Sequence, residues 1–157
     1  MIIAGTGHRP KYLPCKYKDP HPWLDELRDA IRNQLQVDQP DIVIAGGAIG
    51  MDTWLAEEAL KLDISLHLYL PFKGQGDNWP KKTQETYRNI LSQADKVLYS
   101  YEEYNKDCFH HRDRAMVEAA DKVYSLLRPD FTSGGTFYTV SYANKHNVLV
   151  QNFWIEC

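Results

Sequence analysis

Two glycine-rich segments contain the residue types best suited to holding a phosphate group. Gly46–Gly50 separates an apolar run from a helical pattern, and Gly134-Gly135-Thr136 stands before a second helical pattern. Glycine permits positive φ angles and a close approach of backbone to ligand, and the first turn of a helix offers free N–H groups at its positive dipole end. We therefore predict phosphate contacts from residues of both segments, namely Gly46, Gly47, Ala48, Gly50, Gly134, Gly135 and Thr136.

Each glycine segment also has a purely structural interpretation. A tight turn from a strand into a helix needs glycine even where nothing binds, and the hydroxyl group of Ser133 or Thr136 could cap the second helix. The first segment lacks the Gly-Lys-Ser/Thr ending of a Walker loop and does not match the usual dinucleotide fingerprint. The sequence leaves both interpretations open for each segment, and a shared position at one sheet edge favours binding.

Further candidate ligand contacts come from Gly7, His8, Arg9 and Arg112. The first three follow an apolar run, and an arginine there can hold a phosphate through a forked pair of hydrogen bonds. The helical pattern places Arg112 at a helix start, where a positive charge opposes the dipole unless it faces an anion. The alternative for Arg9 is a surface ion pair, and for Arg112 a solvated charge.

Three acidic residues are candidates for contacting a ligand or for acid–base chemistry. Asp52 follows the first glycine segment, where an acid is expected for dipole reasons, and we interpret it mainly as a group that stabilises the turn. Glu57 and Asp113 are the candidate catalytic acids or bases. Spacing alone supports no Ser-His-Asp or Cys-His constellation, so the sequence leaves open whether the chain is an enzyme.

Trp79 lies in a predicted loop and is the candidate for stacking on a nucleotide base, with local packing as the alternative. Cys108, His110 and His111 have no established metal-ligand spacing, and adjacent histidines of a helix point about 100° apart. We therefore expect no metal and no cofactor.

Apolar runs alternate with helical stripes and must position these residues. Strands are expected at residues 1–4, 42–45, 64–70, 97–99, 123–127 and 148–150, with a helix in each interval between them. This order predicts an α/β fold with a mostly parallel sheet and helices on both faces. Ligands bind outside the carboxyl ends of such strands, and both glycine segments, His8-Arg9 and Pro71–Gln75 fall there.

The composition excludes several classes of protein. A length of 157 residues fits one domain, without a boundary, and a formal net charge of -3 gives no basic field for nucleic acid, although a local basic patch remains open. No apolar run approaches the ~20 residues of a membrane span, and the first residues do not resemble a signal peptide. Three cysteines fit a reducing compartment, so we expect a cytoplasmic protein that does not enter a membrane.

The motifs taken together resemble the YpsA-like family of the SLOG superfamily, which includes the DprA/Smf DNA-uptake proteins and the LOG phosphoribohydrolases. The matching pieces keep one order over nearly the whole chain and are Gly7-His8-Arg9-Pro10; Gly46–Asp52 with Trp54 and Ala56-Glu57; Pro71–Gln75 with Trp79; Tyr87 with Ala94-Asp95; Arg112-Asp113 and Met116-Val117 with Asp121; and Gly134-Gly135-Thr136 with Tyr142-Ala143.

The resemblance implies a single Rossmann-like three-layer domain over residues 1–157. It implies a nucleotide or nucleotide-derived ligand, of ADP-ribose type for instance, bound at the glycine turns by a sensor or ligand-processing domain. Other SLOG domains sense such signals in antiviral defence, and a phage or prophage origin fits a compact chain of this kind. The oligomeric state stays open, a homo-oligomer included.

Two alternatives accompany this hypothesis. The first is a nucleotide N-glycosidic hydrolase related to the LOG enzymes, whose signature is Pro-Gly-Gly-x-Gly-Thr-x-x-Glu. Residues 133–140 lack its second Gly-Thr and its glutamate, which argues against that reaction. The second is a DprA-like module for single-stranded DNA or for a protein partner, with contacts from Lys16, Lys18, Lys81 and Lys82. The acidic balance of the chain gives the DNA version little support.

Overall fold

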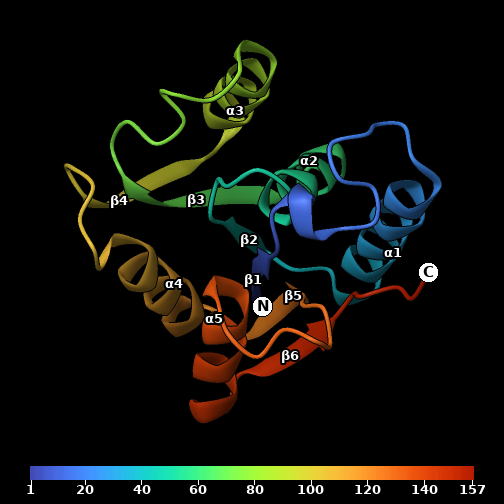
Figure 1. Ribbon diagram of the computed structural model, residues 1–157. Coiled ribbons are helices and arrows are strands. Elements are labelled where there is room, and N and C mark those ends of the chain that lie inside the picture. The colour runs from blue at the N-terminus through green and yellow to red at the C-terminus, as the bar shows by residue number, and fades with distance from the viewer.

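The computed structural model describes residues 1–157 and confirms the predicted alternation of strands and helices (Figure 1). The elements are β1 (Ile2–Gly7), the 3₁₀ helix η1 (Pro10–Tyr12), α1 (Pro22–Asp38), β2 (Ile42–Ala45), α2 (Met51–Lys61), β3 (Ser65–Phe72), α3 (Lys81–Gln93), β4 (Lys96–Tyr101), α4 (Cys108–Ala119), β5 (Lys122–Leu126), α5 (Gly135–Lys145) and β6 (Leu149–Asn152).

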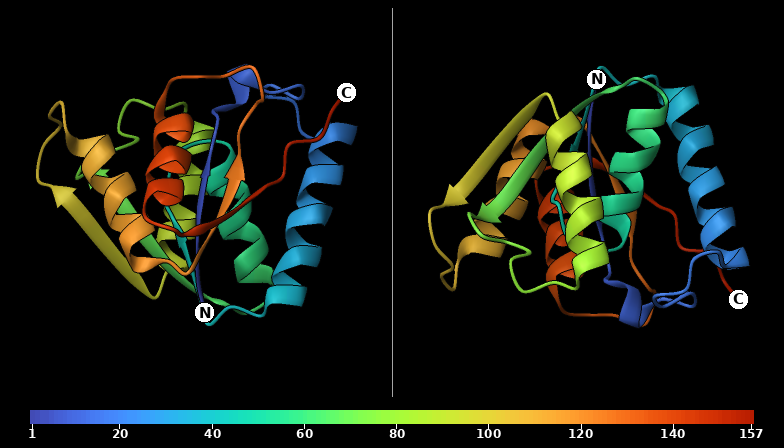
Figure 2. Two further views of the ribbon diagram at one scale, coloured as in Figure 1. Left: turned by 90° about the horizontal axis from the view of Figure 1, so that it is seen from below. Right: turned by 90° about the horizontal axis from the view of Figure 1, so that it is seen from above.

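All six strands form one parallel sheet in the order β4-β3-β2-β1-β5-β6. Helices α1, α2 and α3 cover one face, and α4 and α5 cover the other, which makes the three layers of a Rossmann-like fold (Figures 1 and 2). Because every strand runs the same way, the carboxyl ends of all six meet at one edge of the sheet. None of the helices has the length and apolar character needed to cross a membrane.

The central strand β1 is buried and packs closely against α2. A side chain at Gly5 would collide with Leu55, and one at Gly7 would collide with Met51 and with Leu126 of β5. Glycine at these positions lets the helix lie directly on the sheet. The main core of 22 buried residues gathers on this face, between the sheet, α1 and α2. The alternating burial predicted for residues 64–70 is confirmed in β3, which lies next to the edge strand.

Two local features differ from the sequence expectation. The segment after β1 forms η1, which the apolar pattern does not reveal. Helix α4 begins at Cys108, so Arg112 lies in its second turn and not at its start. The first turn of α4 was missed because its residues include two histidines, and the side chain of the N-cap residue Asp107 forms no capping hydrogen bond.

Candidate functional site

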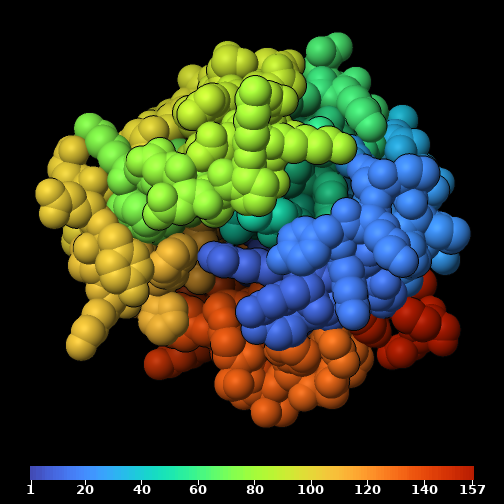
Figure 3. Space-filling model, turned by 45° about the horizontal axis from the view of Figure 1, so that its top comes forward, coloured from blue at the N-terminus to red at the C-terminus, as the bar shows by residue number.

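A cavity of about 570 Å³ opens at the carboxyl edge of the sheet. Four segments contribute to its lining: residues 5–12 at the end of β1 and just after it, Ala48 of the first glycine turn with Asp52 of α2, residues 109–116 of α4, and residues 131–136 before and at the start of α5. The segment around η1 and the segment before α5 lie side by side beyond the end of β1 (Figures 2 and 3). The cavity therefore occupies the edge where the parallel strands end.

The second glycine turn faces open space in this cavity. A Cβ atom built on Gly134 or Gly135 would meet no other atom within 4 Å. Gly134 has φ +94 and precedes the first turn of α5, and no side chain caps the helix, so neither Ser133 nor Thr136 plays that role. The N–H groups of the first turn have no partner within the helix, which leaves an exposed anion-binding end beside Ser133.

The first glycine turn is packed against the protein instead. A Cβ atom on Gly46 would lie 2.6 Å from Nη1 of Arg112. One on Gly50, where φ is +105, would lie 2.8 Å from the carbonyl oxygen of His8. One on Gly47, where φ is +78, would collide with Leu70. Of this segment and the residue pair after it, only Ala48 and Asp52 line the cavity.

Arg112 and Asp113 form a buried pair on the floor of the cavity. The guanidinium group of Arg112 donates from Nε to Asp113 over 2.7 Å and from Nη1 to the carbonyl oxygen of Gly46. Their side chains are only 9% and 10% exposed. Arg112 therefore braces the first glycine turn from α4. It also lines the cavity, and its Nη2 group has no hydrogen-bond partner in the protein.

Asp52 combines a structural contact with an altered acidity. Its Oδ2 atom accepts a hydrogen bond from the backbone N–H of Ala48 over 3.1 Å, which is the turn-stabilising role expected from the sequence. Burial raises the pKa of Asp52 from 3.8 to about 6, although Arg112 and the Ala48 hydrogen bond act in the opposite direction. A buried carboxyl group that titrates near neutral pH inside a cavity is typical of a functional site.

His8 is held in its neutral form beside the cavity. Its Nε2 atom accepts the backbone N–H of Arg128 over 2.9 Å, which assigns the ring proton to Nδ1. Burial, aided by the charge of Arg128, lowers the pKa of His8 from 6.5 to about 4. The imidazole ring packs 4.3 Å from the ring of Phe131. His8 can thus donate one hydrogen bond but adds no positive charge.

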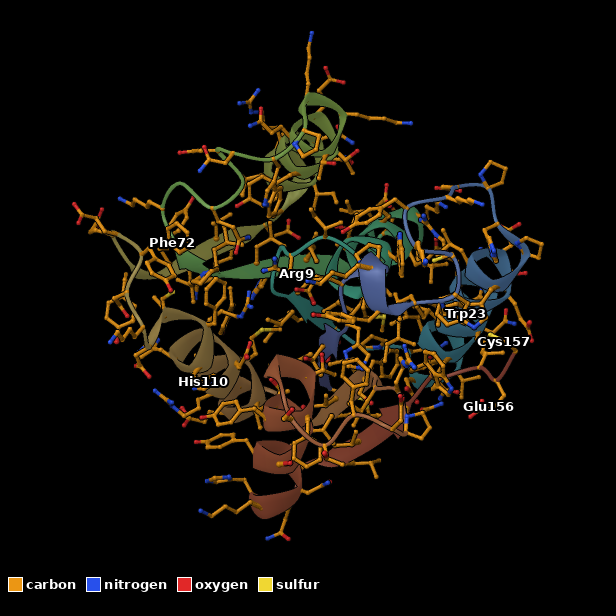
Figure 4. All side chains as sticks on the ribbon, viewed as in Figure 1. Arg9, Trp23, Phe72, His110, Glu156 and Cys157 are labelled. Carbon is orange, nitrogen blue, oxygen red and sulfur yellow. The ribbon has the colours of Figure 1, made fainter.

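Two exposed cations supply the positive charge at the cavity. Arg9 and Lys11 both line it, and neither forms an ion pair with an acidic side chain. Figure 4 marks Arg9 and, on the α4 side of the same edge, His110. Sequence reasoning missed Lys11, although its position two residues beyond Arg9 in the same loop was an available signal.

The aromatic residues of the cavity are not those expected from the sequence. Trp79 lies outside it, where it packs beneath Gly76 and 5.1 Å from the ring of Tyr87. Besides His8, the rings that line the cavity come from η1, α4 and the segment before α5, and they are Tyr12, Phe109, His110 and Phe131. No local pattern distinguishes these rings from packing residues.

Glu57 is not brought to the site. It lies on α2 and pairs with Arg28 of α1 at 3.3 Å, beside the fully buried Glu58. Cys108 is buried, and His111 shares a hydrogen bond of 2.7 Å with Ser100. His110 stacks 4.0 Å from the ring of Tyr138. The carboxyl groups that the fold places at the cavity are therefore Asp52 and Asp113.

Several known proteins resemble this chain in sequence or in fold. A "UPF0398 protein" of Bacillus thuringiensis (strain Al Hakam) and one of Bacillus cereus (strain Q1) are each 29% identical over 156 residues, which covers 92% of this chain and 83% of the relative. DNA processing protein A (DprA) of Streptococcus pneumoniae superposes with a TM-score of 0.63 at 21% identity, over 96% of this chain and 49% of that chain.

DNA processing protein A of Helicobacter pylori, whose structure is described in terms of its single-stranded DNA binding mode, superposes with a TM-score of 0.69 at 19% identity. This chain spans 64% of the H. pylori protein and about half of the S. pneumoniae one, and these two likenesses show the fold. The family model YpsA, described as "YspA SLOG family", matches residues 3–153. The chain therefore belongs to the YpsA family of SLOG proteins.

Proposed function

We propose that residues 1–157 form one domain that binds a nucleotide or a nucleotide-derived ligand, such as an ADP-ribose-type molecule, in the cavity at the carboxyl edge. The domain acts in the cytoplasm as a sensor or a ligand-processing unit. The observation that carries the proposal is the uncapped, open first turn of α5 in the same cavity as the unpaired cations Arg9 and Lys11. A helix N-terminus with nearby cations suits a phosphate group.

The size and lining of the cavity support the same ligand class. A volume of about 570 Å³ falls within the ~300–1,000 Å³ that small-molecule sites usually occupy. The phosphate lies at Ser133–Thr136 in this proposal. The carboxylates Asp52 and Asp113 accept hydrogen bonds from ribose hydroxyl groups, and Nη2 of Arg112 donates to the ligand. The base stacks on an aromatic ring of the lining, such as Phe109, and not on Trp79.

The test is a binding panel with AMP, ADP, ATP, NAD, ADP-ribose and cyclic nucleotides, read by thermal shift and then by calorimetry. A ligand at 100 times its Kd adds about 2.7 kcal/mol of stability and shifts the melting temperature by roughly 5–10 °C. Absence of any shift across the panel overturns the proposal.

A matched pair of variants tests the position of the phosphate. Ser133→Asp adds a negative charge at the exposed residue before the α5 turn, and Asn78→Asp adds the same charge at an exposed loop residue outside the cavity. Ser133→Asp should weaken binding about tenfold or more through charge repulsion, whereas Asn78→Asp should leave it unchanged. Equal affinities in the two variants would move the phosphate away from α5.

Hydrolysis of an N-glycosidic bond is the second candidate. The specific observation in its favour is the pair of buried carboxyl groups, Asp52 and Asp113, beside Arg112, with the pKa of Asp52 raised to about 6 by burial. A carboxyl group with such a pKa can act as a general acid near neutral pH. Chromatography of bound nucleotides after incubation tests this: release of base or ribose phosphate that Asp113→Asn abolishes supports hydrolysis, and unchanged ligand speaks against it.

Single-stranded DNA is a further candidate ligand, suggested by the binding mode named for the H. pylori relative. The net charge of -3 opposes DNA binding, but Arg9 and Lys11 place two positive charges at the cavity. Fluorescence anisotropy with a labelled oligonucleotide at low salt separates the two classes, because electrostatic DNA binding falls steeply as salt rises. Tight DNA binding without nucleotide binding would favour the DNA version.

A further inference from the structure

Strand β4 forms one edge of the sheet, and no further strand or helix covers that edge. No element lies beyond β4 in either view of Figure 2. Two of its large side chains remain well exposed, Leu98 at 39% and Tyr99 at 40%. The strand carries no proline, and its only charged residue is Lys96 at its first position. Edge strands without such protection are templates for pairing with another chain.

The backbone of β4 shows which groups are free to pair. The N–H of Asp95 donates to Leu66, and the carbonyl oxygen of Tyr101 accepts from Lys73, so the odd-numbered residues turn their backbone groups toward β3. Successive residues of a strand point their backbone groups to opposite sides. Leu98 and Ser100 therefore direct N–H and C=O groups outward from the sheet.

We propose that two copies of this chain pair through β4, in antiparallel fashion, around a two-fold axis, so that one continuous sheet runs through both copies. A symmetric pair of identical strands can meet edge to edge only in the antiparallel sense. This inference does not depend on the ligand of the cavity.

Charge complementarity selects one register. When the axis passes between the two Tyr99 residues, Leu98 of each copy lies opposite Ser100 of the other and can exchange both backbone hydrogen bonds with it. The same register sets Lys96 opposite Glu102, an acid that is 79% exposed and now contacts Lys73 at 3.1 Å. A shift of the register by two residues in either direction separates Lys96 from Glu102. In one direction Leu98 then lies opposite Leu98 of the other copy, and in the other direction it lies opposite Glu102.

The other edge of the sheet is less suited to pairing. Strand β6 has four residues, compared with six in β4. The side chain of Asn152 is already engaged with the backbone of Leu127 through two hydrogen bonds. The exposed Leu149 of β6 therefore offers a matched control for β4, because it is an apolar residue on an edge strand without a predicted partner.

Cross-linking tests the register directly. In a pair without backbone hydrogen bonds the two Cα atoms lie about 4.5 Å apart, which a disulfide can span. We expect Tyr99→Cys, made in a Cys157→Ser background because Cys157 is exposed, to form a covalent dimer under oxidised glutathione. Leu149→Cys in the same background should stay monomeric. No cross-link at Tyr99→Cys, or equal cross-linking in both variants, overturns the proposal.

The mass in solution gives an independent readout. Light scattering across a concentration series should find a species of twice the 18.2 kDa chain mass. Leu98→Lys should shift the dimer dissociation constant upward at least about tenfold, since it replaces an exposed apolar residue of each paired strand with a cation, while Leu149→Lys should not. Thermal melting of both variants checks that they remain folded. A wild-type chain that is monomeric throughout, or a dimer lost in Leu149→Lys but kept in Leu98→Lys, contradicts the proposal.

Discussion

At Gly46, Gly47 and Gly50 an added Cβ atom would press against other parts of the protein, whereas at Gly134 and Gly135 it would meet nothing within 4 Å. Both segments connect the end of a sheet strand to a helix, and both read as phosphate loops in the sequence. The first is glycine-rich because Arg112, Leu70 and the segment after β1 approach it closely. The second is glycine-rich where the protein leaves space, which is where a ligand can approach the backbone.

The largest expected effect is a loss of stability when Arg112, which supports the first glycine turn, is replaced. Arg112→Met removes the partner of Asp113 and the donor to the carbonyl oxygen of Gly46, and leaves buried charge uncompensated. Breaking a buried ion pair in this way should cost about 4 kcal/mol of the free energy of unfolding. Urea denaturation measures it, with Arg114→Met, half-exposed on the same helix, as a control that should cost far less. An equal loss of stability in the two variants would contradict the structural role of Arg112.

The next effect is a pH dependence carried by Asp52. Burial raises the pKa of Asp52 from 3.8 to about 6, so the folded protein binds this proton more tightly than the unfolded chain. The resulting stabilisation is complete below the unfolded pKa and is lost as pH rises through the folded pKa, by roughly 3 kcal/mol at most.

Asp52→Asn keeps an oxygen that can accept from Ala48 and removes the titration. The variant should gain stability relative to the wild type as pH rises through about 6, as measured by urea unfolding on either side of that value. His8 acts in the opposite sense, because its pKa is lowered from 6.5 to about 4 and its contribution is lost as pH falls. For that reason the difference between variant and wild type is the informative quantity. A constant difference across the range contradicts the raised pKa.

Alanine substitutions compare the two turns themselves. Gly47→Ala imposes a positive φ on alanine and a collision with Leu70, and should cost about 2 kcal/mol of stability. Gly135→Ala has neither problem and should stay within about 0.5 kcal/mol of the wild type. Gly74→Ala, at φ +91 in an exposed loop, separates backbone strain from packing. If Gly135→Ala were as costly as Gly47→Ala, the contrast between the turns would be wrong.

A smaller effect concerns the ligand. Arg9→Gln removes an exposed, unpaired cation at the cavity and should weaken nucleotide binding about fivefold, with a weaker salt dependence. Arg88→Gln makes the same change at an exposed, unpaired arginine of α3 outside that cavity. Calorimetry at two salt concentrations should find Arg88→Gln like the wild type. An identical loss of nucleotide affinity in both variants would indicate that Arg9 acts through the overall charge of the protein and not through a contact at the cavity.

The smallest effect is expected at Glu57. Its pair with Arg28 is 3.3 Å long and partly exposed, so Glu57→Gln should change stability by less than about 0.5 kcal/mol. Ligand binding should not change, because Glu57 does not line the cavity. A clear loss of binding or turnover in this variant would restore Glu57 as a functional residue.

Much of the fold could be predicted because the signals are local. Strand β2 has the predicted bounds, and the stripe from Leu24 to Leu35 marks the buried face of α1. The candidate site was predicted only in part. His8, Arg9 and Gly134-Gly135-Thr136 do line the cavity, since residues after parallel strands meet at one edge. Trp79 and Glu57 were misplaced because their neighbours come from other elements, Tyr87 for one and Arg28 for the other.

The order of strands and helices, the edge at which the unusual residues meet and the family to which the chain belongs could all be inferred from residue patterns alone. Periodicity and glycine placement depend on neighbours along the chain, so they can be read directly. The packed fold was needed to show which glycine turn is open, that Arg112 braces one turn from a distant helix, and that β4 ends the sheet. Those facts depend on atoms far apart in sequence, and the same glycines suit either a close-packed neighbour or a bound ligand.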